Sequence, residues 1–353
     1  MTWVFRFKTE KKEAAGVMNK FKQIFGGGLI LWMCVLGCAS EEDKKRGGLE
    51  VDIEQEVDLS VAPEFSGDSA YQFVERQVGF GPRVPNSEEH ERCGEWLAQE
   101  LQRHGAEVIV QKGKSKAFDG KVLELSNIVG QYNPNSKNRI MLYAHWDTRP
   151  FADKDIIRKN EPIDGANDGG SGVGVLLEIA RQLSEKPPRI GVDIIFFDGE
   201  DYGAPNGTPS SSSSYLDWCL GSQFWSEQPH RYGYRARFGI LLDMVGAKDA
   251  VFNREGTSMK YAPSVVRKVW SRAEKLGYGN LFQNKETPST VDDNLFVSEM
   301  GGVPSVNIVD YRMNVMPMGY GPFHHTHADN MTVIDRSTLE AVGKTVLSIV
   351  YSE

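Results

Sequence analysis

Between residues 68 and 353, segments with apolar residues at helical spacing alternate with short, continuous apolar runs. Apolar positions recur at helical spacing in residues 69–77, 87–104, 172–183, 262–276 and 337–351. Short apolar runs, typical of buried strands, occupy residues 122–129, 140–144, 192–197, 238–242 and 305–309. Because helical and strand patterns alternate, we expect one α/β domain over 68–353, with a mostly parallel twisted sheet and helices on both of its faces.

The N-terminal segment has a different pattern, typical of a targeting signal. Lys20 and Lys22 precede an apolar run over 26–35, which is shorter than a membrane span. The run ends in Val-Leu-Gly-Cys at Cys38, which resembles a bacterial lipoprotein box. A signal peptide or buried helix that happens to end in cysteine is the alternative.

This pattern leads to three expectations about the first 67 residues. Residues 1–38 are expected to be a signal peptide with its start at Met18, and 39–67 a flexible tether. Cys38 is expected to carry a lipid that anchors the protein in the bacterial cell envelope, in the periplasm or at the outer membrane or cell surface.

The net charge and the cysteine spacing argue against two classes of function, nucleic-acid binding and a local cysteine metal site. The 353 residues carry a formal charge of -8, which argues against a nucleic-acid-binding surface because such a surface needs a basic stripe. Cys93 and Cys219 are the cysteines outside the signal segment, and the sequence leaves their pairing open. Neither has the CxxC or CxH spacing of a local metal site.

Acidic and histidine residues follow the predicted buried strands, where open α/β sheets bind their ligands. They are His145, Asp168, Glu200, Asp201, Asp243 and His325. Each has a simpler explanation when it is taken alone: Asp168 as a helix cap, His145 as a hydrogen-bonded histidine, Glu200 and Asp201 as solvated loop acids.

These acids and histidines come from separate chain segments but are expected at one edge of the sheet, which favours a shared role. The adjacent carboxylates of Glu200 and Asp201 repel each other, and burying them requires a cation or shared protons. A catalytic zinc ion uses three protein ligands and keeps an open position. Asp168, Asp201 and His325 would supply such a set, which leaves Glu200 free to move protons.

The motifs resemble those of the aminopeptidase-type zinc exopeptidases of family M28, and within them the glutaminyl-peptide cyclotransferases. The resemblance covers nearly all of residues 70–352. It rests on GPRVPNSEEH (81–90), YAHWDTRPFAD (143–153), GANDGGSGVGVLLEIAR (165–181), IIFFDGED (194–201), LLDMVGA (241–247), VDDNLF (291–296), GGVPSVNIV (301–309) and HTHADN (325–330).

The resemblance implies roles for individual residues. Asp168 and His325 correspond to zinc ligands, and Glu200 to a general acid/base. Asp201 stands where many relatives have a glutamate ligand, so the coordination differs in detail.

Other positions correspond to the substrate site. Asp243 corresponds to an acid that holds the substrate, and Asp292 to a further catalytic acid, although a one-residue gap would select Asp293 instead. The pattern of eukaryotic cyclases is broken at His324, where they have a pocket tryptophan, and Trp218 is a candidate for that wall.

Three functions remain open from the sequence, and peptide or protein N-termini are the expected substrates of the first two. A cyclotransferase would use one zinc ion to convert N-terminal glutamine to pyroglutamate, with release of ammonia. An aminopeptidase of the same fold would use two, with His145 and Asp243 binding the second ion and Asp168 bridging. A lipoprotein that only binds peptides or partners is the third.

Overall fold

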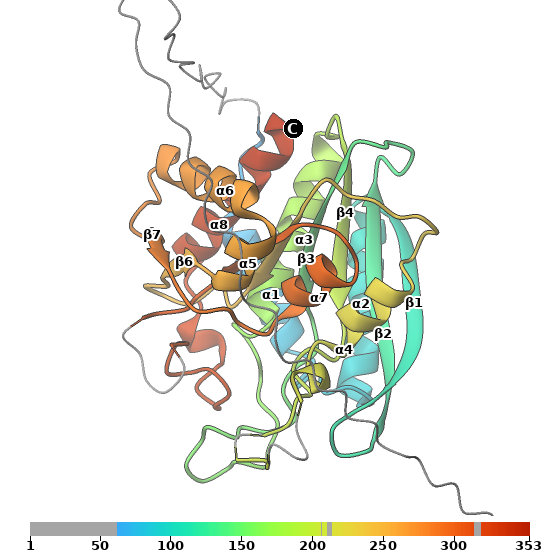
Figure 1. The fold of residues 1–353 in the computed structure, drawn as a ribbon, viewed down its shortest axis with the longest axis vertical. Helices are drawn as coiled ribbons and strands as arrows, with labels where there is room; N and C mark the ends of the chain where they lie inside the picture. The colour runs from blue at the N-terminus through green and yellow to red at the C-terminus, as the bar shows by residue number, and fades with distance from the viewer. Residues whose placement is uncertain (1–61, 206, 210–213, 314–318) are drawn as a thin grey trace, which may run out of the picture. The chain divides into compact units, whose positions relative to one another are not determined.

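The central sheet has the strand order β1-β2-β4-β3-β5-β8 in the computed structural model, which describes residues 62–205, 207–209, 214–313 and 319–353 (Figure 1). Its strands are β1 (Glu107–Lys116), β2 (Val122–Tyr132), β3 (Arg139–His145), β4 (Gly191–Phe197), β5 (Gly239–Asp243) and β8 (Ser305–Val309). The pairs β4–β3, β3–β5 and β5–β8 are parallel, whereas β1–β2 and β2–β4 are antiparallel. The predicted mostly parallel sheet is confirmed, and the two antiparallel pairs at one edge make it a mixed sheet.

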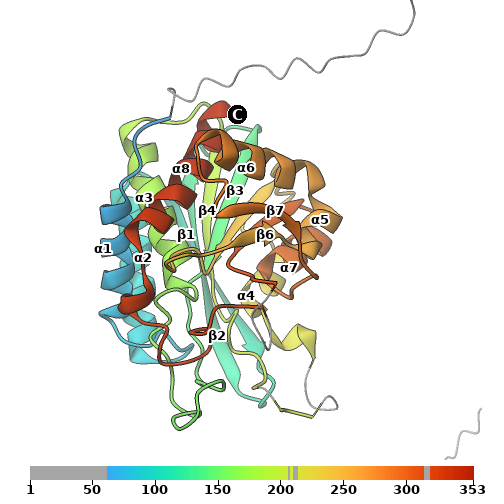
Figure 2. The ribbon, with the colours of Figure 1, turned by 90° about the vertical axis from the view of Figure 1, so that its left-hand side faces the viewer.

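Helices cover both faces of this sheet (Figure 2). On one face lie α2 (Glu88–Arg103), α3 (Gly170–Glu185) and α8 (Arg336–Ser352), and α1 (Gly67–Val78) packs on α3 and α8. The other face packs against α4 (Leu220–Glu227) and α7 (Asp293–Glu299). Beside β8 lie α5 (Gly256–Tyr261), α6 (Pro263–Lys275) and the parallel pair β6 (Phe252–Arg254) and β7 (Phe282–Glu286). Two short 3-10 turns, η2 (Tyr215–Asp217) and η3 (Met331–Val333), complete the described elements.

The burial of β3 on both faces explains its continuous apolar sequence. Leu142 and Ala144 belong to the core under α1, α2, α3 and α8, whereas Met141 and Tyr143 belong to the core under α4 and α7. All four side chains are fully buried. Because successive side chains of a strand point to opposite faces, a strand between two helix layers needs apolar residues at every position.

Parallel pairing brings the carboxyl ends of β3, β4, β5 and β8 to one edge of the sheet. His145 ends β3, Asp243 ends β5, and Glu200 follows β4 after a short turn. The first turn of α3 packs directly on β5 at this edge, since a Cβ atom on Gly172 would lie 2.0 Å from the carbonyl oxygen of Leu242. The glycine-rich first turn of α3 therefore allows the loop that carries Asp168 to approach the sheet.

The sequence did not predict β1, α4, α5, α7, β6 or β7. β1 is a half-exposed edge strand, and because lysines alternate along its second half, it lacks the continuous apolar run of a buried strand. The described end of the expected tether packs on the fold, because Phe65 is buried and Ser66 caps α1. Met18, Cys38 and residues 39–61 lie outside the described residues. Among the helices that the structure describes, none is both long and apolar enough to cross a membrane.

Candidate active site

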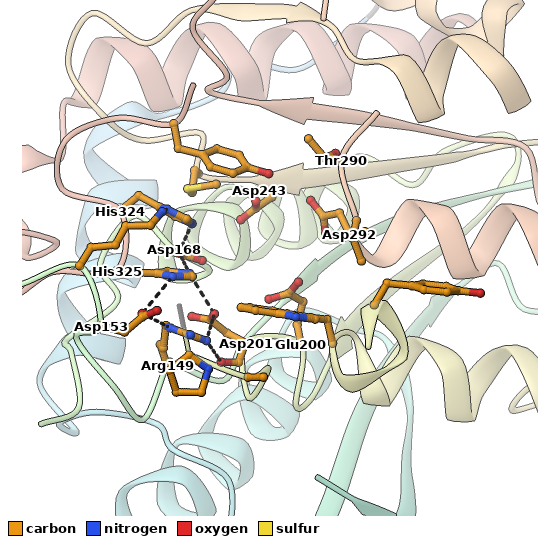
Figure 3. Close-up of a pocket in the computed structure, with 18 of the residues that line it drawn as sticks. Arg149, Asp153, Asp168, Glu200, Asp201, Asp243, Thr290, Asp292, His324 and His325 are labelled. Carbon is orange, nitrogen blue, oxygen red and sulfur yellow. Dashed lines mark hydrogen bonds and ion pairs between the residues drawn. The ribbon is translucent and has the colours of Figure 1, made fainter. Parts of the chain in front are cut away.

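Asp168, Asp201 and His325 meet around one histidine nitrogen (Figure 3). The Nε2 atom of His325 lies 3.2 Å from Oδ1 of Asp201 and 3.8 Å from Oδ2 of Asp168. All three side chains are buried. The structure thus brings both predicted carboxylate ligands to His325 from distant parts of the chain, whereas the ligand atoms that all lie within 4.8 Å of one another are those of Asp168, His324 and His325.

A second group shares Asp168 with the first. The Nε2 atom of His145 lies 3.1 Å from Oδ1 of Asp168 and 3.3 Å from Oδ1 of Asp243. Side-chain atoms of His145, Asp168 and Asp243 are close enough to hold one metal ion, and so are those of Asp168, His324 and His325. Asp168 is therefore the common member of both candidate metal groups.

Asp168 does not act as a helix cap. The N-cap residue of α3 is Gly169, and no side chain caps this helix. Instead, the carboxylate of Asp329 accepts hydrogen bonds from the backbone N–H groups of Asn167 (2.7 Å) and Asp168 (3.1 Å). These bonds fix the loop and leave the Asp168 side chain facing the site.

Asp147, which follows β3, holds the turn after β4 in a similar way. The carboxylate of Asp147 accepts hydrogen bonds from the backbone N–H groups of Glu200 (3.0 Å) and Asp201 (3.2 Å). The carbonyl oxygen of Asp201 accepts a hydrogen bond of 3.0 Å from Arg149. The backbone of this acidic pair is thereby fixed on both sides.

Glu200 belongs to a third buried group, with Cys219 and Asp292. One atom from each of these side chains lies within 4.8 Å of the others. The Cys219 thiol donates to Oε1 of Glu200 at 3.3 Å, and Asp292 accepts from the Asn307 amide at 2.6 Å. Asp292 lines the pocket, whereas Asp293 is fully buried and is absent from the pocket wall.

Burial and like charge shift the pKa values of these acids. Burial raises the pKa of Glu200 well above its ordinary value, and the charges of Asp201 and Asp292 raise it further. Burial, followed by the charges of Asp243 and Asp293, also raises the pKa of Asp292. These carboxyl groups can therefore hold protons at pH values where exposed acids have lost them.

Asp168 behaves in the opposite way. Burial alone would raise the pKa of Asp168, but the hydrogen bond from His145 and the charges of His145 and His324 hold it below its ordinary value. Burial raises the pKa of Asp201. The site therefore keeps Asp168 ionised beside carboxyl groups whose ionisation is disfavoured.

These residues fit a divalent cation. The buried Oδ2 atom of Asp201 has no hydrogen-bond partner among the described residues. A buried carboxylate oxygen without a partner costs free energy, and a bound cation would compensate for that cost. Two carboxylates and one imidazole form a donor set of the kind that binds zinc at catalytic sites.

The pocket around this centre has a volume of about 570 Å³. Trp218 lies in its wall, stacked on His325 with ring centroids 6.0 Å apart and planes 7° apart. His324 lies in the wall as well, and so do Ala204, Pro205 and Tyr215 from the segment between β4 and α4. The two aromatic candidates from the sequence, Trp218 and His324, thus line the pocket.

Sequence reasoning missed several residues of the site. They are Asp147, Arg149, Asp153, Lys154, Cys219 and Asp329. Four of them lie in the HWDTRPFADK segment directly after β3, so their position after a buried strand was an available signal. Cys219 gave no signal, because its neighbours in the site are remote in sequence. Cys93 and Cys219 are both free and buried.

Solved structures that are similar to this chain include glutaminyl cyclases and an aminopeptidase precursor. Glutaminyl cyclase of Tannerella forsythia is 51% identical, covers 82% of this chain and 100% of its own, and has a TM-score of 0.80. Glutaminyl cyclase of Bacteroides thetaiotaomicron bound to N-acetylhistamine is 49% identical, with 83% and 99% covered and a TM-score of 0.81. A leucine aminopeptidase precursor from Bacteroides thetaiotaomicron is also 49% identical, with 83% and 99% covered and a TM-score of 0.79.

Curated relatives have lower sequence identity to this chain, and the chain matches less than two thirds of their length. The chain spans 46% of aminopeptidase YwaD of Bacillus subtilis, at 29% identity, and 63% of glutaminyl-peptide cyclotransferase of Bothrops jararaca, at 25% identity. The model of peptidase family M28 matches residues 127–350, which include every predicted site residue of the folded domain. The chain belongs to peptidase family M28.

Proposed function

We propose that this chain is a zinc-dependent glutaminyl-peptide cyclotransferase, which converts the N-terminal glutamine of peptides to pyroglutamate with release of ammonia. One observation carries the proposal. Glu200 and Asp292, two buried carboxyl groups with raised pKa values, lie within 4.8 Å of each other on the pocket wall, outside both groups that contain Asp168. Such a pair can accept one proton and hold another.

Cyclisation requires this kind of proton transfer. The α-amine of the substrate forms a bond to its own γ-carbon, and the bond from that carbon to the amide nitrogen breaks. Glu200 accepts a proton from the attacking amine and returns it to the departing ammonia. Asp243 and Asp292 hold the amine, and Trp218 packs against the glutaminyl side chain. Because the attack is intramolecular, orientation within the pocket removes much of the entropic barrier.

Asp168, Asp201 and His325 would hold the zinc ion. When bound, zinc supplies Lewis-acid polarisation of the γ-carbonyl oxygen and stabilises the negative charge that develops there. Asp147 and Asp329 act through the backbone, because their hydrogen bonds keep the segments of the ligands in place.

A second candidate is an aminopeptidase that uses two zinc ions. The group formed by His145, Asp168 and Asp243 favours it, since these atoms are close enough to hold a second ion. The leucine aminopeptidase precursor matches this chain as well as the glutaminyl cyclases do. Metal stoichiometry separates the two: one equivalent per chain supports the cyclotransferase, and two support the aminopeptidase.

The activity test uses dipeptide amides that begin with glutamine or leucine. A cyclotransferase releases ammonia and a pyroglutamyl product from the glutamine-led amide and leaves the leucine-led amide intact. An aminopeptidase releases free leucine. If the zinc-loaded protein gives no product from either substrate, both enzymatic proposals fail and a function in binding peptides or partners remains.

We also propose that the protein is anchored in the bacterial cell envelope through Cys38, on the basis of the sequence alone. Expression of the full chain with a labelled fatty acid is expected to label the protein, and Cys38→Ala is expected to abolish the label. Equal labelling of both would overturn this proposal.

A further inference from the structure

The wall of the pocket contains an ammonium group without an acidic partner. Lys154 lines the pocket and is half-buried. Its Nζ atom contacts Nδ1 of His324 and lies 5.7 Å from the centre of the Tyr320 ring. Within the part of the chain that the structure describes, no carboxylate lies within ion-pair distance of Lys154.

The carboxylates closest to Lys154 in sequence are engaged elsewhere. Asp153 accepts a hydrogen bond of 2.7 Å from Nε of Arg149. Asp155 accepts from the backbone N–H of His327 at 3.0 Å and contacts the ring of the same histidine. Neither side chain therefore forms an ion pair with Lys154.

The position of Lys154 is fixed by the candidate metal site. Its backbone N–H donates a hydrogen bond of 3.3 Å to the carbonyl oxygen of His325. Its ammonium group lies against one nitrogen of His324, and the other nitrogen of that ring lies 3.7 Å from Asp168. The imidazole ring of His324 thus lies between Lys154 and Asp168.

Lys154, which contacts His324, lies across the pocket from Glu200 and Asp292. Figure 3 shows Glu200 and Asp292 on one side of the site and His324 and His325 on the other. A substrate amine is attracted to the acidic side. Among the residues that line the pocket, Lys154 and Arg149 are the cations, and Arg149 already binds Asp153 and Asp201. Lys154 is therefore the cation that remains for the substrate.

We propose that Lys154 is a specificity-determining residue, which binds the acidic side chain of the second residue of the peptide. This inference rests on the proposed cyclotransferase function. A peptide bound by its amine on the acidic side extends by about 3.3–3.6 Å per residue. An aspartate or glutamate in the second position would give Lys154 the carboxylate that the protein does not supply.

Three dipeptide amides test the proposal: Gln-Glu-amide, Gln-Gln-amide and Gln-Lys-amide. The amides carry no terminal carboxylate, so the second side chain alone changes the charge. In the zinc-loaded enzyme, kcat/KM for Gln-Glu-amide is expected to exceed that for Gln-Lys-amide about tenfold at low salt, mainly through KM. The ratio is expected to fall as ionic strength rises, because salt screens partly exposed charges.

Lys154→Met removes the charge and keeps much of the length of the side chain. It is expected to reduce the ratio to about one, whereas Lys154→Arg is expected to keep it within about threefold of the original. Lys159→Met is the matched control, since Lys159 is exposed in the same loop and lies outside the pocket wall. Its ratio is expected to equal that of the unmodified enzyme.

The outcomes also separate this inference from the proposed function. Ammonia release from all three amides at equal kcat/KM overturns the role of Lys154 and leaves the cyclotransferase intact. A lack of ammonia from every glutamine-led amide overturns the cyclotransferase itself. If Lys154→Met lowers kcat/KM equally for all three amides, Lys154 has only a structural role and the inference is wrong.

Discussion

The carboxylate of Asp147 holds the backbone of Asp201, whose N–H group donates to Oδ2 of Asp147 at 3.2 Å. The other oxygen of Asp147 accepts from the N–H of Glu200. One side chain at the end of β3 thereby fixes both acids that follow β4. Because Asp147 is fully buried, no water can replace these hydrogen bonds without local rearrangement.

Asp147→Asn is expected to lower zinc affinity by about 10- to 100-fold, the usual loss when a group that orients a metal ligand is changed. The amide keeps one acceptor oxygen, but its NH₂ group faces a backbone N–H donor. Zinc titration against a competing chelator measures the effect. Asp68→Asn is the control, since Asp68 is exposed at the start of α1 and far from these contacts in the sequence. An unchanged affinity in Asp147→Asn would show that the backbone is held by other groups.

Glu200→Gln is expected to retain zinc and lose turnover by about 10²- to 10⁴-fold, because a carboxamide cannot accept and return the proton. The neighbouring residues are preserved, since glutamine keeps the shape of the side chain and one acceptor oxygen for the Cys219 thiol. Ammonia release and metal content are measured on the same preparation. Glu286→Gln, at the exposed end of β7, serves as the control. Near-normal turnover by Glu200→Gln at full zinc content would refute the role of Glu200.

The strands that position the site could be predicted from the sequence because they are buried on both faces. β3, β4, β5 and β8 read as continuous apolar runs, and the polar residues after them mark the carboxyl edge of the sheet. This is why the sequence alone groups Asp168, Asp201 and His325 at one site. The resemblance to family M28 supplied their individual roles.

Contacts between remote segments could not be predicted in this way. Neither the position of Cys219 beside Glu200 nor the hydrogen bonds that Asp329 accepts from the loop before α3 follow from a local pattern. The choice between Asp292 and Asp293 also needed the fold, because it depends on where α7 begins. Packing decides such details, and packing is not visible in the periodicity of a single sequence.

The adjacent histidines His324 and His325 are expected to differ in their effect on zinc. His325→Ala should reduce the zinc content after dialysis, because it removes the imidazole that lies between Asp168 and Asp201. His324→Ala should retain zinc, since the Nδ1 atom of His324 contacts Lys154 and its Nε2 atom is 3.7 Å from Asp168. Metal analysis of both variants at equal protein concentration gives the comparison. Loss of zinc in His324→Ala together with full occupancy in His325→Ala would assign the ligand to His324.

His230, which is not among the residues that line the pocket, is expected to make the stability of the fold depend on pH. Burial lowers the pKa of His230 to about 4 from its ordinary value of 6.5, and its Nδ1 atom accepts a hydrogen bond of 3.0 Å from the indole of Trp225. The unfolded chain therefore binds a proton at this histidine more readily than the folded one. The free energy of unfolding should be unaffected by His230 above pH 6.5 and should fall by up to about 3 kcal/mol as the pH decreases to 4.

His230→Asn tests this dependence, because its side-chain oxygen can still accept the Trp225 hydrogen bond and does not titrate. The other titrating groups are common to both proteins, so the difference between their urea-unfolding free energies at pH 7.5 and at pH 4.5 isolates His230. The loss between these two pH values should be smaller in the variant by about 2–3 kcal/mol. An equal loss in both proteins would mean that His230 is protonated in the fold as readily as in the unfolded chain, which requires the indole to release its nitrogen.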